Sequence, residues 1–411
     1  MSGGRSLRVV VLALMVVAPL FASGVEPALA SASCIVKNRT SGAVYAPTDG
    51  ASLQTAIDDA LEGEALAVRG RCVGSYTIQR SLALIGVGTD RYPRATIDAD
   101  GGPYALYMAG YGDLRLQRLK ITGGRSTGRG GGIINEGGGS MVLSDTWVTG
   151  NRADLGGGGI FHFSGDLQLF DSRVSRNRSS IGGGGGIYAY VSSVSLNGRS
   201  SIDHNFGNVG GGIEGGGAVD IFDSSHVNGN LSFNSGGGVF GGQVTLHDHA
   251  RISGNQAGTR TGHTSAGGGV FGTLVMMDAS MIVNNVSMSE GGGAFTDSGT
   301  IEMLGESRIA GNIAPNGGGI ASFGGTVTMS GGSTIGSNAA RRDGGGIWFQ
   351  EGALTMSEGA SIVLNTARGG DPATPDGIGG GVRTCGGTAL TGATAGANVA
   401  TNVPDDIADC H

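Results

Sequence analysis

Residues 236–255 read GGGVFGGQVTLHDHARISGN, and this stretch decides the fold. A glycine block leads into a short run in which apolar and polar residues alternate. A turn follows, and then the quartet Ile252-Ser253-Gly254-Asn255. Alternation with a period of two over so few residues is typical of short strands and not of helices. Both the glycine block and the quartet recur along the chain.

The aliphatic-x-x-Asn quartet occurs nine times, at spacings of 25 to 30 residues. Its asparagines are Asn151, Asn177, Asn205, Asn230, Asn255, Asn285, Asn312, Asn338 and Asn365. The glycine blocks keep nearly the same period. A repeat of this length with several short strands predicts one coil of a solenoid. We expect about twelve parallel coils, with the aliphatic residue of each quartet pointing inward and the asparagines forming a ladder at one corner. We also expect these asparagines to adopt the left-handed conformation there.

The composition supports a turn-dense β protein. The chain has 411 residues, of which 84 are Gly, only 9 are Pro and 39% are hydrophobic. Collagen is excluded because the glycines come in blocks, and disorder because apolar residues recur regularly. An all-α fold is excluded because each interior glycine would cost a helix roughly 1 kcal/mol. The net charge is −7 and there is no basic cluster along the sequence, so we expect no nucleic-acid partner.

Residues 1–30 predict a secretory signal peptide. Arg5 and Arg8 precede an apolar run, and Ala28-Leu29-Ala30 supplies a small-residue cleavage site. A signal anchor is the alternative, although the apolar run is short for a membrane span. We therefore expect a secreted, extracellular monomer whose mature chain has no membrane span.

The mature chain is expected to have three parts. Residues 31–63 form an N-terminal segment with a capping helix, residues 64–384 form the solenoid, and residues 385–411 form a C-terminal cap. The segment from Ser52 to Leu61 predicts the helix, because its apolar residues, Leu61 included, fall on one helical face. Ser52 is the expected N-cap.

Four cysteines lie in two pairs near the ends of the chain, which predicts disulfides in an oxidising compartment. Three pairings are open, and we expect the local one, Cys34–Cys72 with Cys385–Cys410. Each loop closure would stabilise the fold by roughly 3–4 kcal/mol. Metal binding is the alternative, and the absence of a CxxC spacing disfavours it.

The order of these features resembles the pectin-lyase-like right-handed parallel β-helix superfamily. The helix is followed by GEALAVRG at 63–70, by SLALIG at 81–86, and then by the Gly-Gly-Gly-Ile and Ile-x-x-Asn repeats. The repeats are similar to those of polymorphic outer-membrane proteins, with Gly in place of Ala and Ile or Val in place of Phe. The resemblance covers residues 50–410. It implies an all-β, single-stranded right-handed parallel β-helix, and it implies no particular activity, because members include lyases, hydrolases and adhesins.

The catalytic clusters of the superfamily's enzymes have no match in this sequence. Arg91-Tyr92-Pro93-Arg94 is interpreted as a turn, with a lyase-type catalytic arginine motif as the alternative. His247-Asp248-His249 is interpreted as a solvated turn, with a two-ligand metal site as the alternative. An acidic column precedes the ladder asparagines and is also interpreted as turns, with calcium binding as the alternative. Its members are Asp145, Asp171, Asp223, Asp248, Asp278, Glu306 and Glu358. We therefore predict no catalytic residue, no metal ligand and no cofactor.

One column of residues is a candidate binding site. It follows the aliphatic residue that ends each glycine block, so it should point outward. The members of this aromatic column are Phe161, Tyr188, Phe240, Phe271, Phe295 and Trp348. Outward rings at coil intervals can stack on the sugars of a glycan. The alternative, which we favour, is that the rings pack on one another.

These features predict an extracellular protein for surface interaction or carbohydrate binding. Its partner would be an extracellular polysaccharide or a cell-surface component. The alternative is a polysaccharide lyase or glycoside hydrolase of the pectin-lyase-like superfamily.

Overall fold

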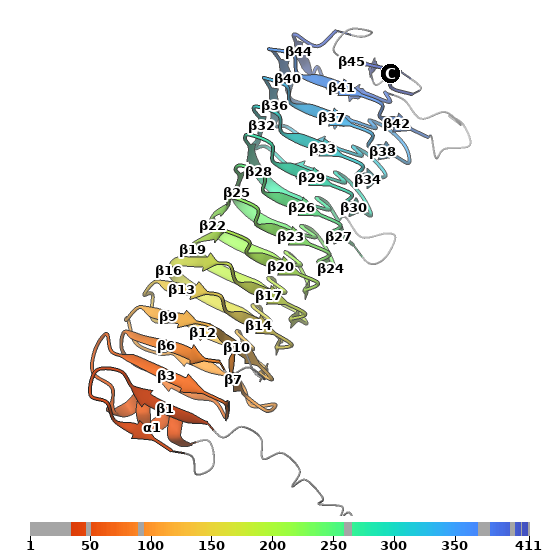
Figure 1. The fold of residues 1–411 in the computed structure, drawn as a ribbon. Helices are drawn as coiled ribbons and strands as arrows, with labels where there is room; N and C mark the ends of the chain where they lie inside the picture. The colour runs from red at the N-terminus through yellow and green to blue at the C-terminus, as the bar shows by residue number, and fades with distance from the viewer. Residues whose placement is uncertain are drawn as a thin grey trace, which may run out of the picture.

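The fold is given by a computed structural model, which describes residues 34–46, 51–88, 94–258, 265–368, 379–394, 399–403 and 405–409. These residues form an all-β parallel solenoid of about 12 turns with one helix. Figure 1 shows the turns stacked into a rod that begins at α1 (Ala51–Asp59). The predicted parallel solenoid is confirmed. The predicted signal peptide, residues 1–30, lies outside the described residues.

Three sheets run along the rod. Each coil in the repeating part of the rod contributes strands to all three sheets. Sheet A contains β4 (Arg71–Val73), β7 (Ala95–Asp98), β10 (Leu119–Thr122), β14 (Trp147–Thr149), β17 (Arg173–Ser175), β20 (Ser201–Asp203), β23 (His226–Asn228), β26 (Arg251–Ser253), β29 (Met281–Val283), β33 (Arg308–Ala310), β37 (Thr334–Gly336), β41 (Ser361–Val363) and β45 (Val399–Ala400). Sheet C contains β11 (Arg125–Ser126), β15 (Arg152–Ala153), β18 (Arg178–Ser179), β21 (Phe206–Gly207), β24 (Leu231–Ser232), β27 (Gln256–Ala257), β30 (Val286–Ser287), β34 (Ile313–Ala314), β38 (Ala339–Ala340) and β42 (Thr366–Ala367).

Sheet B is the largest and contains the strands that follow the glycine blocks. Its first members are β1 (Ile35–Asn38), β2 (Val44–Tyr45), β3 (Ala65–Arg69), β5 (Tyr76–Ile78), β6 (Leu82–Val87), β8 (Leu106–Met108), β9 (Leu114–Gln117), β12 (Ile133–Asn135) and β13 (Met141–Ser144). Five coils then have one long strand each: β16 (Ile160–Phe170), β19 (Ile187–Asn197), β22 (Ile213–Ile221), β25 (Val239–Leu246) and β28 (Val270–Met276). The later coils again have two, in β31 (Ala294–Thr296), β32 (Thr300–Met303), β35 (Ile320–Ser322), β36 (Thr326–Met329), β39 (Ile347–Phe349), β40 (Ala353–Met356), β43 (Val382–Thr384), β44 (Ala389–Thr391) and β46 (Ile407–Asp409).

The core is a column of aliphatic side chains inside the rod. In sheet A, Val148 pairs with Val174 and Val174 pairs with Ile202, so the same position of every quartet stacks in register. All three side chains are fully buried. The prediction that the aliphatic residue of the quartet points inward is confirmed. Burial of each such side chain contributes roughly 1.5–3 kcal/mol, which makes this column a main source of stability.

The repeat asparagines form a continuous ladder along the rod, and in each coil the asparagine directly precedes the strand of sheet C. The Asn255 Nδ2 donates to Asn285 Oδ1 at 3.0 Å and to the Val227 carbonyl at 3.0 Å, and the same pattern joins the coils from Asn151 to Asn365. The ladder continues to Asn402, which donates in turn to Asp406 Oδ1. The expectation that the asparagines are left-handed is wrong. The left-handed residue is the one before the asparagine, such as Gly254 with φ 62°, so that the amide itself lies inside the ladder.

The N-terminal end differs from the repeats. Strand β1 pairs antiparallel with both β2 and β3. Helix α1 packs beside them and buries Leu53 and Ile57. The helix ends at Asp59 and Leu61 is exposed, so the expectation that Leu61 lies on the apolar face is wrong.

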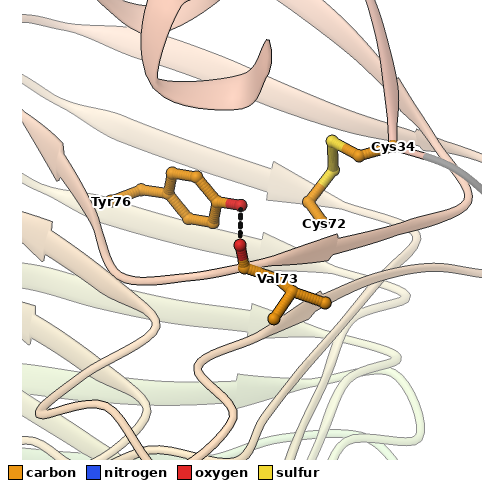
Figure 2. The surroundings of a disulfide bond; sticks show 4 residues. All are labelled: Cys34, Cys72, Val73 and Tyr76. Atoms are coloured by element: carbon orange, nitrogen blue, oxygen red, sulfur yellow. Dashed lines mark hydrogen bonds between the residues drawn. A yellow bond between two sulfur atoms is a disulfide. The ribbon is translucent and has the colours of Figure 1, made fainter. Parts of the chain in front are cut away.

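A disulfide joins the N-terminal segment to the solenoid. Figure 2 shows Cys34 bonded to Cys72 of β4, with a Cα–Cα distance of 4.6 Å. Nearby, the Tyr76 hydroxyl donates to the Val73 carbonyl at 2.9 Å. The Cys34–Cys72 prediction is confirmed. For the second predicted disulfide, Cys385–Cys410, Cys410 lies outside the described residues.

Candidate functional site: the aromatic patch on sheet B

The register of sheet B places the aromatic column on one face. Phe161 pairs with Tyr188, Tyr188 with Glu214, and Glu214 with Phe240. The column continues through Phe271, Phe295, Ala321 and Trp348. Its rings are not equally accessible. Phe161 is fully buried and Phe295 is 4% exposed, whereas the other four aromatic members are half-buried. Two of the six predicted rings therefore offer no free face to a ligand.

The C-terminal part of the column is a packed ring stack. The centroids of Phe240 and Phe271 lie 4.8 Å apart, and those of Phe271 and Phe295 lie 4.9 Å apart. Phe323 then joins the stack between Phe295 and Trp348, at 5.0 and 5.5 Å. Contacts of this kind are worth about 0.5–1.5 kcal/mol per pair beyond burial. The packing interpretation fits this part of the column.

The N-terminal part is more exposed and forms a patch. Phe163 and Tyr190 stack with their centroids 5.5 Å apart and an interplanar angle of 14°. They are 39% and 44% exposed. Tyr188 meets Tyr190 edge-on at 6.0 Å, and the Arg129 guanidinium lies 5.9 Å from the Tyr190 ring and 6.0 Å from the Tyr188 ring. We call Phe163, Tyr188, Tyr190 and Arg129 the aromatic patch.

Further apolar side chains on the same coils are exposed. Val191 is 58% exposed, and Leu155 and Ile181 in the glycine-rich turns are also exposed. Scattered exposed apolar residues are normal, but a cluster of large ones on consecutive coils marks a contact surface. These coils therefore differ from the C-terminal ones, where the rings cover one another.

Glu214 interrupts the aromatic column beside the patch. Its Oε2 atom is buried without a hydrogen-bond partner. It occupies the space above Gly183, where an added Cβ would lie 1.4 Å from Oε2. Burial raises the pKa of Glu214 to about 7. The patch is thus bordered by a carboxyl group that changes its charge near neutral pH.

The pKa of Glu214 makes stability depend on pH. The folded protein holds this proton up to about pH 7, whereas the unfolded chain releases it near 4.5. Stability should therefore fall as pH rises from 4.5 to 7, by on the order of 2 kcal/mol after allowance for partial exposure. We expect Glu214→Gln to remove most of this decline, measured as the midpoint of urea unfolding at several pH values. An unchanged decline in the variant would contradict the assignment.

A second charged cluster lies on the outer face of sheet A. Asp203 is buried and accepts a hydrogen bond from Ser201 Oγ at 3.0 Å. Its carboxylate lies 3.0 Å from Arg173 Nε and 3.5 Å from His226 Nε2. The adjacent Asp203 carboxylate raises the pKa of His226. The serine donates to the aspartate and not to the histidine, so this is not a nucleophilic triad. We interpret it as a surface ion-pair network.

The other predicted sites are turns where the structure describes them. Asp248 is left-handed at φ 53°, and His247 stacks on Phe222 at 4.2 Å, so the two histidines do not form a strand-borne pair. Most of the acidic column is left-handed as well; Glu306 is the exception, since Gly305 takes that conformation. Within the described residues, no group of three His, Cys, Asp or Glu side chains is arranged to hold a metal. Residues 91–93 of the arginine-containing turn lie outside the described residues.

Sequence reasoning missed three rings and one cation of these clusters. Phe163, Tyr190 and Phe323 each lie two residues after a position of the column, Phe163 and Tyr190 within their strands and Phe323 directly after β35. The period of two that identified the column also pointed to them. Arg129 lies in a glycine-rich turn, and no sequence signal placed its side chain over rings of the following two coils.

No family profile, curated protein or solved structure matches this chain. Among the described helical residues, none forms a segment long and apolar enough to cross a membrane.

Proposed function

We propose that this protein is secreted and binds extracellular carbohydrate through the aromatic patch. The observation that carries the proposal is the stacked Phe163–Tyr190 pair, whose rings remain about two-fifths exposed on the surface of a rigid strand pair. Aromatic faces held by a scaffold bind sugar rings at little entropic cost. The disulfide and the signal-like N-terminus support an extracellular location.

We also propose a handedness and a family placement for the solenoid. We place the solenoid with the right-handed pectin-lyase-like β-helices and its repeats with those of polymorphic outer-membrane proteins. The asparagine ladder and the glycine-block turns support this placement. Such a rod presents the same position of successive coils at intervals of about 4.8 Å, which suits an extended polymer.

The binding test replaces one exposed ring. Tyr190→Ala should weaken retention on immobilised polysaccharide at least fivefold, because a central aromatic contact is worth about 1–2 kcal/mol or more. Tyr111→Ala is the matched control, since Tyr111 is 91% exposed and stacks on no other ring among the described residues. The wild type is first screened against neutral and acidic polysaccharides, and melting temperatures are compared in parallel.

Two outcomes would contradict the proposal. One is that the wild type binds none of the polysaccharides. The other is that Tyr190→Ala retains full binding, or loses only as much as the Tyr111→Ala control. If Tyr190→Ala loses binding and its melting temperature also falls strongly, Tyr190→Phe separates the loss of a ring contact from unfolding. This variant keeps the ring and should restore binding.

Cleavage of the polysaccharide is the second candidate function, and Glu214 favours it. A half-buried carboxyl group with its pKa raised to about 7, one coil from Tyr188, has the property of a general acid. Incubation with the bound polysaccharide should then give reducing ends or unsaturated products that Glu214→Gln does not give. Binding without any product leaves the protein as a carbohydrate-binding module.

A further inference from the structure

Three arginines line up on sheet C, next to the glycine-rich turns of the same coils. Arg125 of β11 pairs with Arg152 of β15, and Arg152 pairs with Arg178 of β18. All three side chains are exposed. At about 4.8 Å between neighbouring strands, the three Cα atoms span about 10 Å along the rod. We call these residues the arginine ladder.

The ladder borders a surface hollow. The hollow has a volume of about 520 Å³ and is lined by Arg125, Ser126, Thr127, Gly150, Arg152 and Asp154. Asp154 lies 3.5 Å from Arg152, while no ion pair is found for Arg125 or Arg178 among the described residues. The Arg178 guanidinium lies over the Phe206 ring at 4.4 Å, which holds the third rung in place.

The ladder lies in a basic region of an acidic protein. Residues 115–199 contain ten Arg and Lys against five Asp and Glu, although the whole chain has a net charge of −7. The stacking of coils creates this basic region, although the sequence shows no basic cluster along the chain. The arginines are 26 or 27 residues apart in sequence, so they form no cluster until the coils stack.

We infer that the arginine ladder binds an acidic glycan, by its carboxylate or sulfate groups, with the chain running along the rod axis. Guanidinium groups bind such anions through paired hydrogen bonds. The exposed hydroxyl of Thr127 and the carboxylate of Asp154 suit sugar hydroxyls. The inference rests on the proposed function in one respect, namely that the ligand is a glycan.

The same features disfavour nucleic acid. Asp154 places a negative charge inside the hollow, and the acidic remainder of the rod repels a long, densely charged polyanion. In an acidic glycan the anionic groups are separated by neutral stretches that carry hydroxyl groups. These hydroxyls can donate hydrogen bonds to the Asp154 carboxylate.

The test compares two triple variants of the full chain. R125Q/R152Q/R178Q removes the ladder, and R251Q/R308Q/R368Q removes three exposed arginines elsewhere with the same change in net charge. Binding of heparin, polygalacturonate, a neutral glucan and single-stranded DNA is measured at low and at physiological salt. We expect the ladder variant to bind heparin or polygalacturonate at least tenfold more weakly, and the control to bind within twofold of the wild type. Weaker binding of polygalacturonate identifies carboxylate as the anion, whereas weaker binding of heparin alone identifies sulfate, because heparin carries both groups.

Several outcomes would overturn the inference. Equal losses in the two triple variants would show a general charge effect, and an unchanged ladder variant would show no role for the ladder. Tighter binding of DNA than of either acidic glycan would assign the ladder to phosphate. The neutral glucan separates the two proposals, because Tyr190→Ala should weaken its binding and the ladder variant should not.

Discussion

Asn255→Ala is expected to destabilise the protein by roughly 3–5 kcal/mol. The Asn255 side chain is 1% exposed and makes four hydrogen bonds. Its loss leaves the backbone N–H of Asn230 and the carbonyl of Val227 buried without these partners. Each unsatisfied buried group costs about 1–3 kcal/mol, and the cavity adds to this. Urea unfolding followed by circular dichroism measures the change.

The matched control for the asparagine ladder is Asn228→Ala in the preceding coil. Asn228 lies on the outer face of sheet A, and its Oδ1 accepts one hydrogen bond from Ser253 Oγ at 3.0 Å. We expect a loss of about 1 kcal/mol or less. Equal effects of the two substitutions would mean that the buried ladder does not hold the coils together.

Gly238→Ala is expected to cost about 3 kcal/mol or more. An added Cβ would lie 2.6 Å from the Gly269 carbonyl oxygen and 3.0 Å from Asn255 Nδ2. That carbonyl also accepts the Val239 N–H at 2.9 Å, so it cannot move away without loss of the coil-to-coil pairing. Small-to-large changes against fixed backbone are among the more damaging substitutions.

The control for this glycine is Gly242→Ala in β25. A Cβ at Gly242 meets no atom within 4 Å, and its φ is not left-handed. Its stability should change by less than about 0.5 kcal/mol, or rise slightly through a smaller unfolded-state entropy. Similar melting temperatures for Gly238→Ala and Gly242→Ala would show that close coil approach is not what requires Gly238.

The repeating architecture was predictable because its main features depend on short sequence patterns that recur in every coil. The quartets predicted the inward aliphatic column and the ladder, and both are present. The backbone geometry at the corner was not predictable in the same way. The left-handed residue is Gly254 in one coil but Arg176 and Leu364 in others, because the ladder fixes the corner and the preceding residue must follow. Within the glycine block before β25, Gly236 is the left-handed residue, whereas Gly238 is constrained by the close approach of the next coil.

The candidate sites were only partly predictable. The aromatic column was found from its spacing, but spacing does not show that Phe161 is fully covered while Tyr190 is exposed. That difference depends on what neighbouring coils place beside each ring. The arginine ladder was missed because a search along the sequence detects charges that are adjacent in the chain. In a solenoid, the relevant neighbours are one coil apart.

Both binding proposals depend on the stacking register, and disulfide trapping tests it most directly. Thr328 and Thr355 are paired across β36 and β40, whereas Ala353 pairs with Thr326. Parallel neighbours lie about 4.8 Å apart, within the range of a disulfide, and a partner two residues out of register lies beyond about 7 Å. The double variant Thr328→Cys/Thr355→Cys should therefore cross-link under mild oxidation, detected by peptide mass spectrometry, and Thr328→Cys/Ala353→Cys should not. Efficient cross-linking of the second pair, or none of the first, would contradict the register and with it both surfaces.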